Sequence, residues 1–355
     1  MKKILIIGGS HSELPLVRES KKMGLYTITV GNVRGNAHLE ADKSYLIDYS
    51  NKEAVLELAI KENIDYVCFG AHDLSMITTA YVAEKLNLEI FDDFNTTCNL
   101  HHKDKFKKIA MKHNLNITKI FNVDNIDNIE FPVVVKPVDM GGGKGISIVK
   151  NKIELQQALK KAKEYSKSGR IIVEEYFKGS LHSISTFIIN KKIVFYYVDN
   201  EYPCLNNPFG VCLSIYPSYE FDLIKAKLLK EIEKVASIFN LKDGLLHLQF
   251  LQNKDEYKLI EFTRRMPGDL YNVPVEYATK TKYSKHIIEF CLGNKPDIEF
   301  VKQNTIVGRF CVIDKNIIPN KNIIKVFNCL NANKKQIIIF KFTPQELNKF
   351  KKEYL

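Results

Sequence analysis

The sequence predicts an α/β protein in which a parallel, doubly wound sheet is followed by α+β parts. In the first region of the chain, short apolar segments alternate with helical segments, which is typical of parallel strands covered by helices on both faces. Further along, apolar strands follow one another more directly, as in antiparallel hairpins. With 355 residues, 45% of them hydrophobic, the chain can hold two or three domains with substantial cores.

The first region, residues 1–100, carries the alternating pattern. Its expected strands are Lys3–Ile7, Tyr26–Val30, Tyr66–Phe69 and a short one near Glu89–Phe91, and its expected helices are Leu14–Met23, Lys52–Glu62 and Leu74–Leu86. Gly8 and Gly9 follow the first strand, but GGSHSE lacks the G-x-G-x-x-G spacing, and no acidic residue for a ribose ends the second strand. The sequence therefore argues against a nicotinamide dehydrogenase. The loop either presents Ser10, His11 and helix amides to an anionic substrate or is a tight strand-to-helix turn.

The later regions begin near Asp104 and are richer in strands. The expected helices are Lys103–His113, Ile153–Ser166 and Leu223–Phe239. The expected strands are Ile117–Phe121, Val133–Lys136, Ser147–Val149, Ile171–Glu175, Ser183–Ile189, Ile193–Asp199, Gly244–Leu251, Tyr257–Phe262, Ile306–Ile313, Lys325–Phe327 and Gln336–Phe342. We divide the chain into residues 1–100, 101–180, 181–295 and 296–355, the last of which is a small strand-rich piece.

Composition argues against several classes of protein. The net charge is +11, from 52 basic and 41 acidic residues, but the excess is mostly lysine. We therefore expect no nucleic-acid partner, and a site for anionic small molecules accounts for the charge equally well. No apolar stretch reaches the length of a transmembrane helix, and Gly8, Gly9 and Glu13 interrupt the amino-terminal apolar run too early for a signal peptide. The seven scattered cysteines form no C-x-x-C pair, which indicates reduced thiols in a cytoplasmic protein.

The most informative segment is FPVVVKPVDMGGGKG, residues 131–145, in which an apolar strand ends at Lys136. The glycine-rich loop that follows contains Gly141, Gly142, Gly143, Lys144 and Gly145. Glycine amides can turn toward an anion with no side chain in the way, and the strand-end lysine adds a charge for the same phosphates. The spacing is not that of the P-loop G-x-x-x-x-G-K-[ST]. Taken alone, the segment would serve equally well as a glycine-rich hairpin turn.

With the motifs further along, this segment resembles the ATP-grasp superfamily, in particular its biotin carboxylase and purine-synthesis branch. The resemblance covers most of the chain. It implies an ATP-grasp fold with a Rossmann-like preceding domain over residues 1–100, a lid over 101–180, a core over 181–295 and a small C-terminal subdomain. It also implies ATP together with Mg²⁺, or Mn²⁺, as cofactors.

The resemblance also implies roles for individual residues. The ATP phosphates would be contacted by Lys105, Lys136, Gly141, Gly142, Gly143, Lys144 and Gly145. The adenine and ribose would be contacted by Glu174, Glu175, Tyr176, Phe177 and His182. The metal positions would be Gln249, Glu261 and Thr263, and the catalytic residues Arg265 and Lys144. These residue types suit a phosphoryl transfer, which proceeds mainly by positioning and electrostatic stabilisation.

Two metal positions depart from the family pattern. The first is usually Glu or Asp and is Gln249 here, and the third is usually Asn and is Thr263 here. Both offer a neutral oxygen, but Glu261 is then the single carboxylate where two are usual. We expect weaker metal binding, or help from a neighbouring carboxylate such as Asp269.

The resemblance implies an ADP-forming ligase that activates a carboxylate as an acyl phosphate and couples it to an amine. Two alternatives stay open: a carboxylation or formyl transfer of the purine-pathway type, and a nucleotide-binding protein that has lost catalysis. The partners would be small-molecule carboxylates and amines, and a homodimer is compatible with the resemblance. The substrate groups are expected to be Ser10, His11, His72, Asp73, Arg264 and Asp269. The irregular segment Glu201–Val211 is either a specificity loop or a plain connection.

Overall fold

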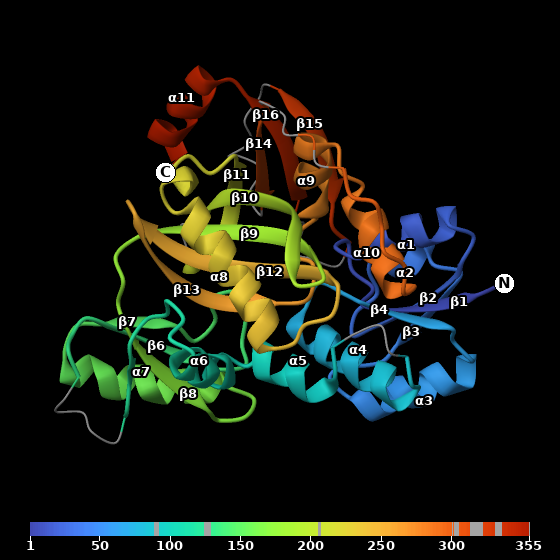
Figure 1. Cartoon of the computed structure of the whole chain (residues 1–355), viewed down its shortest axis with the longest axis horizontal. Helices are drawn as coiled ribbons and strands as arrows, with labels where there is room; N and C mark the ends of the chain where they lie inside the picture. Colours follow the sequence, from blue (N-terminus) through green and yellow to red (C-terminus); the bar gives the residue numbers. More distant parts are fainter. Residues whose placement is uncertain are drawn as a thin grey trace.

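Three sheets make up the described part of the chain (Figure 1). The structure, a computed structural model, describes residues 1–88, 92–123, 129–204, 207–299, 301, 305–312, 322–330 and 336–354. Two four-stranded sheets lie at opposite ends of the molecule, and an eight-stranded central sheet joins them. The predicted α/β class with α+β parts is confirmed.

The amino-terminal sheet is parallel and has the strand order β3-β2-β1-β4. Its strands are β1 (Lys3–Ile7), β2 (Tyr26–Gly31), β3 (Lys43–Leu46) and β4 (Tyr66–Phe69), and its helices are α1 (Leu14–Lys22), α2 (Asn36–Glu40), α3 (Lys52–Glu62) and α4 (Asp73–Lys85). Side chains alternate between the two faces of a strand. Leu5 and Ile7 therefore belong to one core with α3 and α4, while Ile4 and Ile6 belong to another with α1. This is the doubly wound arrangement that the sequence predicts.

A second, antiparallel sheet has the order β5-β8-β6-β7. Its strands are β5 (Ile120–Phe121), β6 (Val133–Pro137), β7 (Ser147–Val149) and β8 (Ile171–Glu175), and the neighbouring helices are α5 (Phe94–His101), α6 (Lys103–Lys112) and α7 (Lys152–Tyr165). Helix α7 packs on this sheet, and we call β5–β8 with α7 the lid. Helix α6 packs toward the central sheet instead, where Phe106 contacts Phe239 and Phe262. It therefore lies between the lid and the core.

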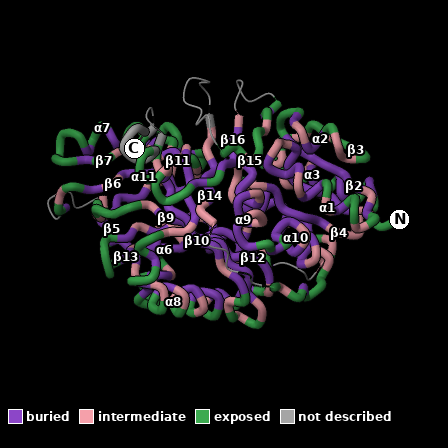
Figure 2. The backbone as a smooth tube through the Cα atoms, turned by 90° about the horizontal axis from the view of Figure 1, so that it is seen from above, coloured by how far each residue is buried: buried purple, intermediate pink, exposed green. Residues whose placement is uncertain are grey.

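The central sheet is antiparallel, with the order β13-β12-β9-β10-β11-β14-β16-β15. Its strands are β9 (Ser180–Ile189), β10 (Lys192–Cys204), β11 (Asn207–Tyr216), β12 (Gly244–Asn253), β13 (Glu256–Thr263), β14 (Ile306–Val312), β15 (Ile323–Asn328) and β16 (Gln336–Phe342). The accompanying helices are a 3₁₀ turn (Phe221–Leu223), α8 (Lys225–Ile238), α9 (Asn272–Thr279), α10 (Tyr283–Cys291) and α11 (Pro344–Tyr354). Helix α8 covers one face, and α10 lies against the other and against α1, so the buried backbone runs continuously into the amino-terminal sheet (Figure 2).

The structure differs from the sequence expectations in a few elements. The helices α2, α5, α9, α10 and α11 and the strands β3 and β11 were not expected. The expected strand near Glu89–Phe91 lies outside the described residues. The segment Glu201–Val211 was expected to be irregular, but its described residues belong to β10 and β11. The three C-terminal strands continue the central sheet through the pairing of β14 with β11. The four-part domain division stays a prediction.

The cysteines only partly follow the expectation of reduced thiols. Five described cysteines are free: Cys68, Cys98, Cys291, Cys311 and Cys329. Cys212 on β11 is disulfide-bonded, so the expectation of reduced thiols is wrong for this residue. Over the described residues, no helix has the length and apolar character needed to cross a membrane.

Candidate functional site

A buried carboxylate in the lid, Glu174, lies between two lysines. Lys136 Nζ, on the neighbouring strand β6, is 2.9 Å from Glu174 Oε1, and Lys107 Nζ, on α6, is 3.2 Å from Oε2. Thr118 Oγ1 donates a hydrogen bond of 2.5 Å to Glu174 Oε2. Burial acts to raise the pKa of Glu174, but the two ammonium groups and this hydroxyl outweigh it and hold that pKa at about 2. The structure thus brings the predicted residues Lys136 and Glu174 together.

The lysines of α6 face different surroundings. Lys103 Nζ lies 2.7 Å from Glu261 Oε2 on β13 and donates a hydrogen bond of 3.1 Å to the Met140 carbonyl, just before the glycine-rich loop. Lys103 and Lys107 are four positions apart and share the buried face of the helix. Lys105 lies off that face and is not brought to Glu261 or to Glu174. Lys103 was not among the residues predicted from the sequence, although the i, i+4 spacing of Lys103 and Lys107 was a signal for a shared helix face.

The glycine-rich loop meets the central sheet at β11. Gly142, Gly143 and Gly145 have φ of 66°, 74° and 74°, a conformation that glycine adopts without strain. A Cβ added at Gly143 would lie 2.5 Å from the backbone carbon of Phe209, on β11. Lys144 is exposed at the loop tip. The loop therefore closes on the β10–β11 hairpin, and any side chain at Gly143 would hold it away.

The residues predicted to bind adenine lie at the end of β8 and just after it. The Glu175 amide donates to the Lys119 carbonyl at 2.9 Å, and the Tyr176 amide donates to the Pro132 carbonyl at 3.1 Å. These bonds fix the backbone, while Tyr176 is exposed and Phe177 is half-buried. The contacts of Glu175, Tyr176 and Phe177 with adenine stay a prediction.

The three predicted metal positions lie on one face of the β12–β13 hairpin. Gln249 is the cross-strand partner of Glu261, and Thr263 follows two residues later on the same face. The Gln249 side chain is already engaged, since its Nε2 donates to Glu201 Oε2 at 2.5 Å. No group of three or more His, Cys, Asp and Glu side chains in the described part of the chain has a metal-binding arrangement. The donors that remain are hard oxygens, which suit a Mg²⁺ ion that also binds substrate phosphates.

Arg265 is held by a residue that the sequence analysis assigned to substrate. Arg265 Nε lies 2.9 Å from Asp73 Oδ1, and its NH2 lies 3.1 Å from Asp73 Oδ2. His101 Nδ1 is also 3.1 Å from Asp73 Oδ1. A Cβ at Gly141 would lie 3.8 Å from Asp73 Oδ2, so this ion pair lies beside the glycine-rich loop. The neighbouring His72 caps helix α4, and its Nδ1 accepts a hydrogen bond from a backbone amide.

Two predicted residues lie away from these groups. The Arg264 side chain points toward Asp92, with Nε 2.7 Å from Asp92 Oδ2, and donates to the Leu245 and Lys242 carbonyls. It therefore supports the packing of the core rather than facing the glycine-rich loop. His182 is fully buried and stacks on Phe250, in the core that α8 covers. Burial lowers the pKa of His182 to about 4, so it is a neutral internal histidine rather than a side chain open to a ribose.

The first loop of the amino-terminal sheet contacts the segment after β13. His11 Nε2 lies 3.2 Å from Asp269 Oδ1, and Ser12 Oγ accepts a hydrogen bond of 2.9 Å from the Asp269 amide. Burial acts to lower the pKa of His11, but the bonds to Asp269 and Cys329 outweigh it and raise that pKa to about 9. Ser10 bonds to Glu13 within its own loop. Asp269 is thus paired with His11, and the carboxylate that reaches Gln249 is Glu201.

A pair of acidic residues on β10 escaped the sequence analysis. Asp199 and Glu201 are 0% and 7% exposed and lie two residues apart on one face of the strand. Burial raises the pKa of Asp199 to about 6 and that of Glu201 to about 8. An acidic residue at every second position of an apolar strand was the available signal, but Glu201 had been placed in an irregular segment.

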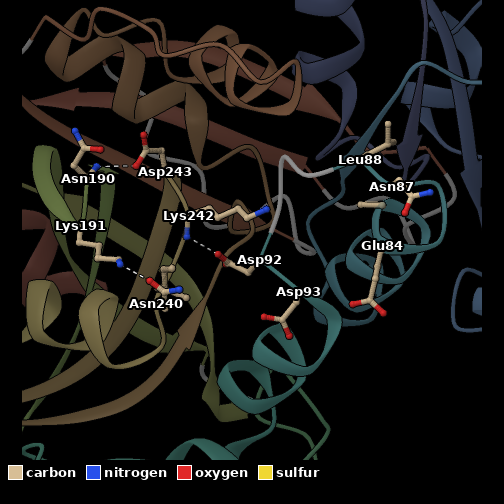
Figure 3. Close-up of a pocket in the computed structure, with 12 residues that line it drawn as sticks. Glu84, Asn87, Leu88, Asp92, Asp93, Asn190, Lys191, Asn240, Lys242 and Asp243 are labelled. Atoms are coloured by element: carbon tan, nitrogen blue, oxygen red, sulfur yellow. Dashed lines mark hydrogen bonds between the residues drawn. The ribbon is translucent and has the colours of Figure 1, made fainter.

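A cavity of about 660 Å³ opens at a different place (Figure 3). It lies between the end of α4, the β9–β10 turn and the turn that precedes β12. Its polar groups pair mostly with one another: the Asn190 amide donates to Asp243 Oδ1 at 2.7 Å, and the Lys242 amide donates to Asp92 Oδ1 at 2.6 Å. None of the predicted site residues lines this cavity.

Comparison with known proteins agrees with this architecture. Residues 100–196 match the family model described as D-ala D-ala ligase C-terminus. The chain is similar to formate-dependent phosphoribosylglycinamide formyltransferase of Prochlorococcus marinus, with 34% identity over 188 residues, 49% of this chain and 47% of that protein. It thus spans about half the length of this relative. It is also similar to phosphoribosylamine–glycine ligase of Pyrococcus furiosus, with 24% identity over 86% of this chain and 76% of that protein.

A solved structure matches the whole fold. It is the biotin carboxylase domain dimer of the Hydrogenobacter thermophilus 2-oxoglutarate carboxylase, in complex with MgADP and bicarbonate. The TM-score is 0.79 at 16% identity, over 96% of this chain and 86% of that one. The preceding sheet, the lid with its glycine-rich loop and the core occur in the order that the resemblance implies. The chain therefore has the ATP-grasp fold.

Proposed function

We propose that this chain is an ATP-dependent ligase that activates a carboxylate as an acyl phosphate and joins it to an amine, with release of ADP and phosphate. The observation that carries this proposal is the convergence of Lys103, Glu261 and Met140 beneath the glycine-rich loop. A cation, a carboxylate and a backbone carbonyl from three different parts of the fold meet there, at the place that we propose for the phosphates. The purine-pathway ligase among the similar proteins supports the same reaction class.

In this proposal the nucleotide lies between the lid and the core. Lys136 and Lys103 would contact its phosphates, and the amides of the glycine-rich loop would cover them. The role given to Lys105 from the sequence passes to Lys103, because only the latter reaches Glu261. The backbone of Glu175, Tyr176 and Phe177 would bind adenine.

The residues present fit a divalent cation. Glu261 and the Gln249 amide oxygen would hold Mg²⁺, or Mn²⁺ in its place, with the phosphates supplying further ligands. The ion would neutralise charge on the transferred phosphoryl group. Arg265, with its planar guanidinium fixed by Asp73, would stabilise the charge that develops on that group or on the tetrahedral centre that follows.

The proposed substrates are a carboxylate and an amine that react near Arg265. A substrate carboxylate would attack the γ-phosphate near Arg265, and the acyl phosphate would then react with an amine. We place the reaction in the cytoplasm, where five free described cysteines would be usual and the disulfide of Cys212 would be the exception. A homodimer is part of the proposal because the similar biotin carboxylase domain is a dimer.

Two other functions are weighed against this one. Carboxylation or formyl transfer is favoured by the formyltransferase among the relatives, and would need bicarbonate or formate as the carboxylate. A catalytically impaired nucleotide-binding protein is favoured by Gln249 at a position where a carboxylate is usual. The two-point hold on Arg265 beside the glycine-rich loop argues against the impaired protein, since either ATP-dependent reaction would use this guanidinium at the transferred phosphoryl group.

The test is ADP release across a matrix of carboxylates and amines, with bicarbonate and formate included. For any pair that turns over, ¹⁸O placed in the substrate carboxylate must appear in the released phosphate. Unlabelled phosphate from a true substrate would exclude the acyl phosphate. ADP release that depends on bicarbonate or formate alone would favour the carboxylation or formyl transfer. Nucleotide binding without ADP release in any combination would favour the impaired protein.

A further inference from the structure

A band of polar side chains crosses one face of the central sheet. In register from β13 to β10, the partners are Glu261, Gln249, Ser183 and Asp199. From β10 to β14 the band continues through Glu201, Ser214 and Arg309. Directly opposed residues, and residues two apart on one strand, share a face. The predicted metal positions and the acidic residues Asp199 and Glu201 on β10 therefore lie in one polar band.

This second group is a buried pair of acids without a cation of its own. Ser183 Oγ donates to Asp199 Oδ1, and Gln249 Nε2 donates to Glu201 Oε2 at 2.5 Å. Asp199 Oδ2 is buried and has no hydrogen-bond partner among the described residues. Buried carboxylates that lack a counter-charge are costly, and a protein that keeps two of them side by side commonly binds a cation there.

The nearest basic residue does not supply that cation. Arg309 Nε donates to Ser214 Oγ at 3.2 Å, and its NH1 donates to the Gly268 and Asp269 carbonyls at 3.0 and 3.2 Å. These guanidinium hydrogen bonds thus go to a hydroxyl and to backbone carbonyls. Arg309 lies close enough to moderate the charge of the acids, but it leaves Asp199 Oδ2 unpaired.

The position of the pair relates it to the reaction. Helix α6, which lies between the lid and the core, meets the core at β13, where Lys107 Nζ donates to the Leu259 carbonyl at 3.1 Å. Asp199 and Glu201 lie on β10. In the sheet, β10 is separated from β12, which carries Gln249, by β9, and from the edge strand β13, which carries Glu261, by β9 and β12. Phe209, on the strand paired with β10, meets the glycine-rich loop. A group bound at β10 would therefore lie beside Gln249 and near the glycine-rich loop.

We propose that Asp199 and Glu201 bind the ammonium group of the acceptor, so that the acceptor is a primary amine that is cationic in solution. This inference rests on the proposed ligase function and names its second substrate class. One carboxylate of the pair accepts a proton from the ammonium group. The freed lone pair forms the C–N bond to the acyl carbon, the C–O bond to phosphate breaks, and the second proton leaves with the phosphate.

Binding measurements test the subsite without turnover. The probes are the standard L-amino acids and short alkylamines, each beside its analogue with hydroxyl in place of the amine, titrated by calorimetry with Mg·ADP present. We expect at least one amine to bind more tightly than its hydroxyl analogue. Asp199→Asn and Glu201→Gln should each lower the affinity for that amine by about tenfold or more, as expected for a lost charge-assisted contact. Glu276→Gln, which alters a carboxylate of α9 that accepts from the Ser284 amide, should leave its affinity unchanged.

Two results would overturn the subsite. One is that no amine binds better than its hydroxyl analogue. The other is that the loss in the β10 variants equals that in Glu276→Gln. A calorimetric Mg²⁺ titration without nucleotide supplies a further arm: Mg²⁺ binding that is lost in Asp199→Asn but kept in Glu261→Gln would assign the pair to a metal and also overturn it.

Hydroxylamine separates this inference from the ligase function. It is mostly uncharged at neutral pH and traps an acyl phosphate as a hydroxamate without needing an ammonium subsite. We expect Asp199→Asn and Glu201→Gln to keep hydroxamate formation while losing amide formation with the cationic acceptor. Hydroxamate formation absent in the wild type for every donor would count against the ligase. Equal loss of hydroxamate and amide in the variants would count against the amine subsite alone.

Discussion

Asp73, the first residue of α4, holds Arg265, which follows β13, in a two-point ion pair with N–O distances of 2.9 and 3.1 Å. The pair joins the amino-terminal sheet to the core, and the two residues are 192 positions apart in sequence. Burial acts to raise the pKa of Asp73, but the Arg265 guanidinium and His101 outweigh it and hold that pKa well below its usual range. Asp73 therefore positions a guanidinium and is not free to bind a substrate.

We expect Asp73→Asn to lower kcat by about 100-fold, the scale of a small misplacement of a catalytic group. ATP affinity should change less than about twofold, because the fold and the lysines remain. Steady-state kinetics and nucleotide calorimetry check this division. Asp92→Asn is the matched control, since Asp92 pairs with the neighbouring Arg264. It should reduce stability and leave kcat unchanged, and an equal loss of kcat in both variants would mean that Asp73 acts only on stability.

The second prediction separates the lysines of α6. Lys103→Ala should weaken the binding of a non-hydrolysable ATP analogue by about 1.5–3 kcal/mol, as expected for a charge-assisted contact, and Lys136→Ala should do the same. Lys105→Ala removes the same charge from the same helix but from another face, so calorimetry should show a change within about 0.5 kcal/mol. A large loss in Lys105→Ala with none in Lys103→Ala would restore the role expected from the sequence.

The third concerns closure of the glycine-rich loop. Hydrogen exchange at residues 141–145 should slow when Mg·ATP is added, since a glycine-rich loop has much freedom to lose. Gly143→Ala should reduce that protection and lower the affinity for ATP by about tenfold or more, because its Cβ would lie 2.5 Å from the Phe209 backbone. Gly142→Ala carries a similar backbone strain in open space and serves as the control. Equal protection with and without nucleotide would identify a rigid turn.

The fourth uses the departure at Gln249. In Gln249→Glu a carboxylate would stand beside Glu201, so we expect lower thermal stability without metal and a larger rise of Tm on adding Mg²⁺ than in the wild type. The Mg²⁺ concentration for half-maximal nucleotide binding should fall, while Glu261→Gln should nearly abolish metal dependence. If neither substitution alters the Mg²⁺ titration, the metal does not lie between these strands.

The fifth concerns pH. The pKa of His11 is raised from 6.5 to about 9, so its pairing with Asp269 stabilises the fold fully below pH 6.5 and is lost as the pH rises through about 9. Allowing for partial exposure, we expect the free energy of unfolding to fall by about 2 kcal/mol over this window. Denaturant titrations of His11→Asn should show a flatter profile, and Asp269→Asn should show the same. If the free energy of unfolding of both variants falls with pH as steeply as that of the wild type, the pH dependence comes from groups other than His11 and Asp269.

Long elements could be predicted because their apolar residues repeat with a clear period. The strands around Lys136 and Glu261 and the helix α8 fall within a residue or two of the expected bounds. Helix α10, YSKHIIEFC, was missed because it is short and mostly buried, and only Lys285 and Glu289 mark its polar side. Helix α9 contains Pro274, which reads as a break rather than as part of a helix.

The placement of a candidate residue was predictable wherever a motif fixes it on a strand, as for Lys136, Glu174 and Glu261. It was not predictable where the partner comes from another sheet. Nothing local to Asp73 indicates that Arg265 lies beside it, and Glu201 reaches Gln249 only because β9 aligns their two strands. Lys105 was chosen from the family resemblance. Lys103, however, lies on the buried face of α6, and Lys105 does not.

The C-terminal strands limit how far the chain can be shortened. Because β14 pairs with β11 and β16 pairs with β14, a fragment ending after α10 would leave β11 as an open edge. Open edges pair readily with other chains, so such a fragment would tend to self-associate. It would also lose Arg309, whose NH1 bonds tie the backbone after β13 to the sheet. The smallest piece worth expressing for crystallisation or kinetics therefore runs from β1 through β16.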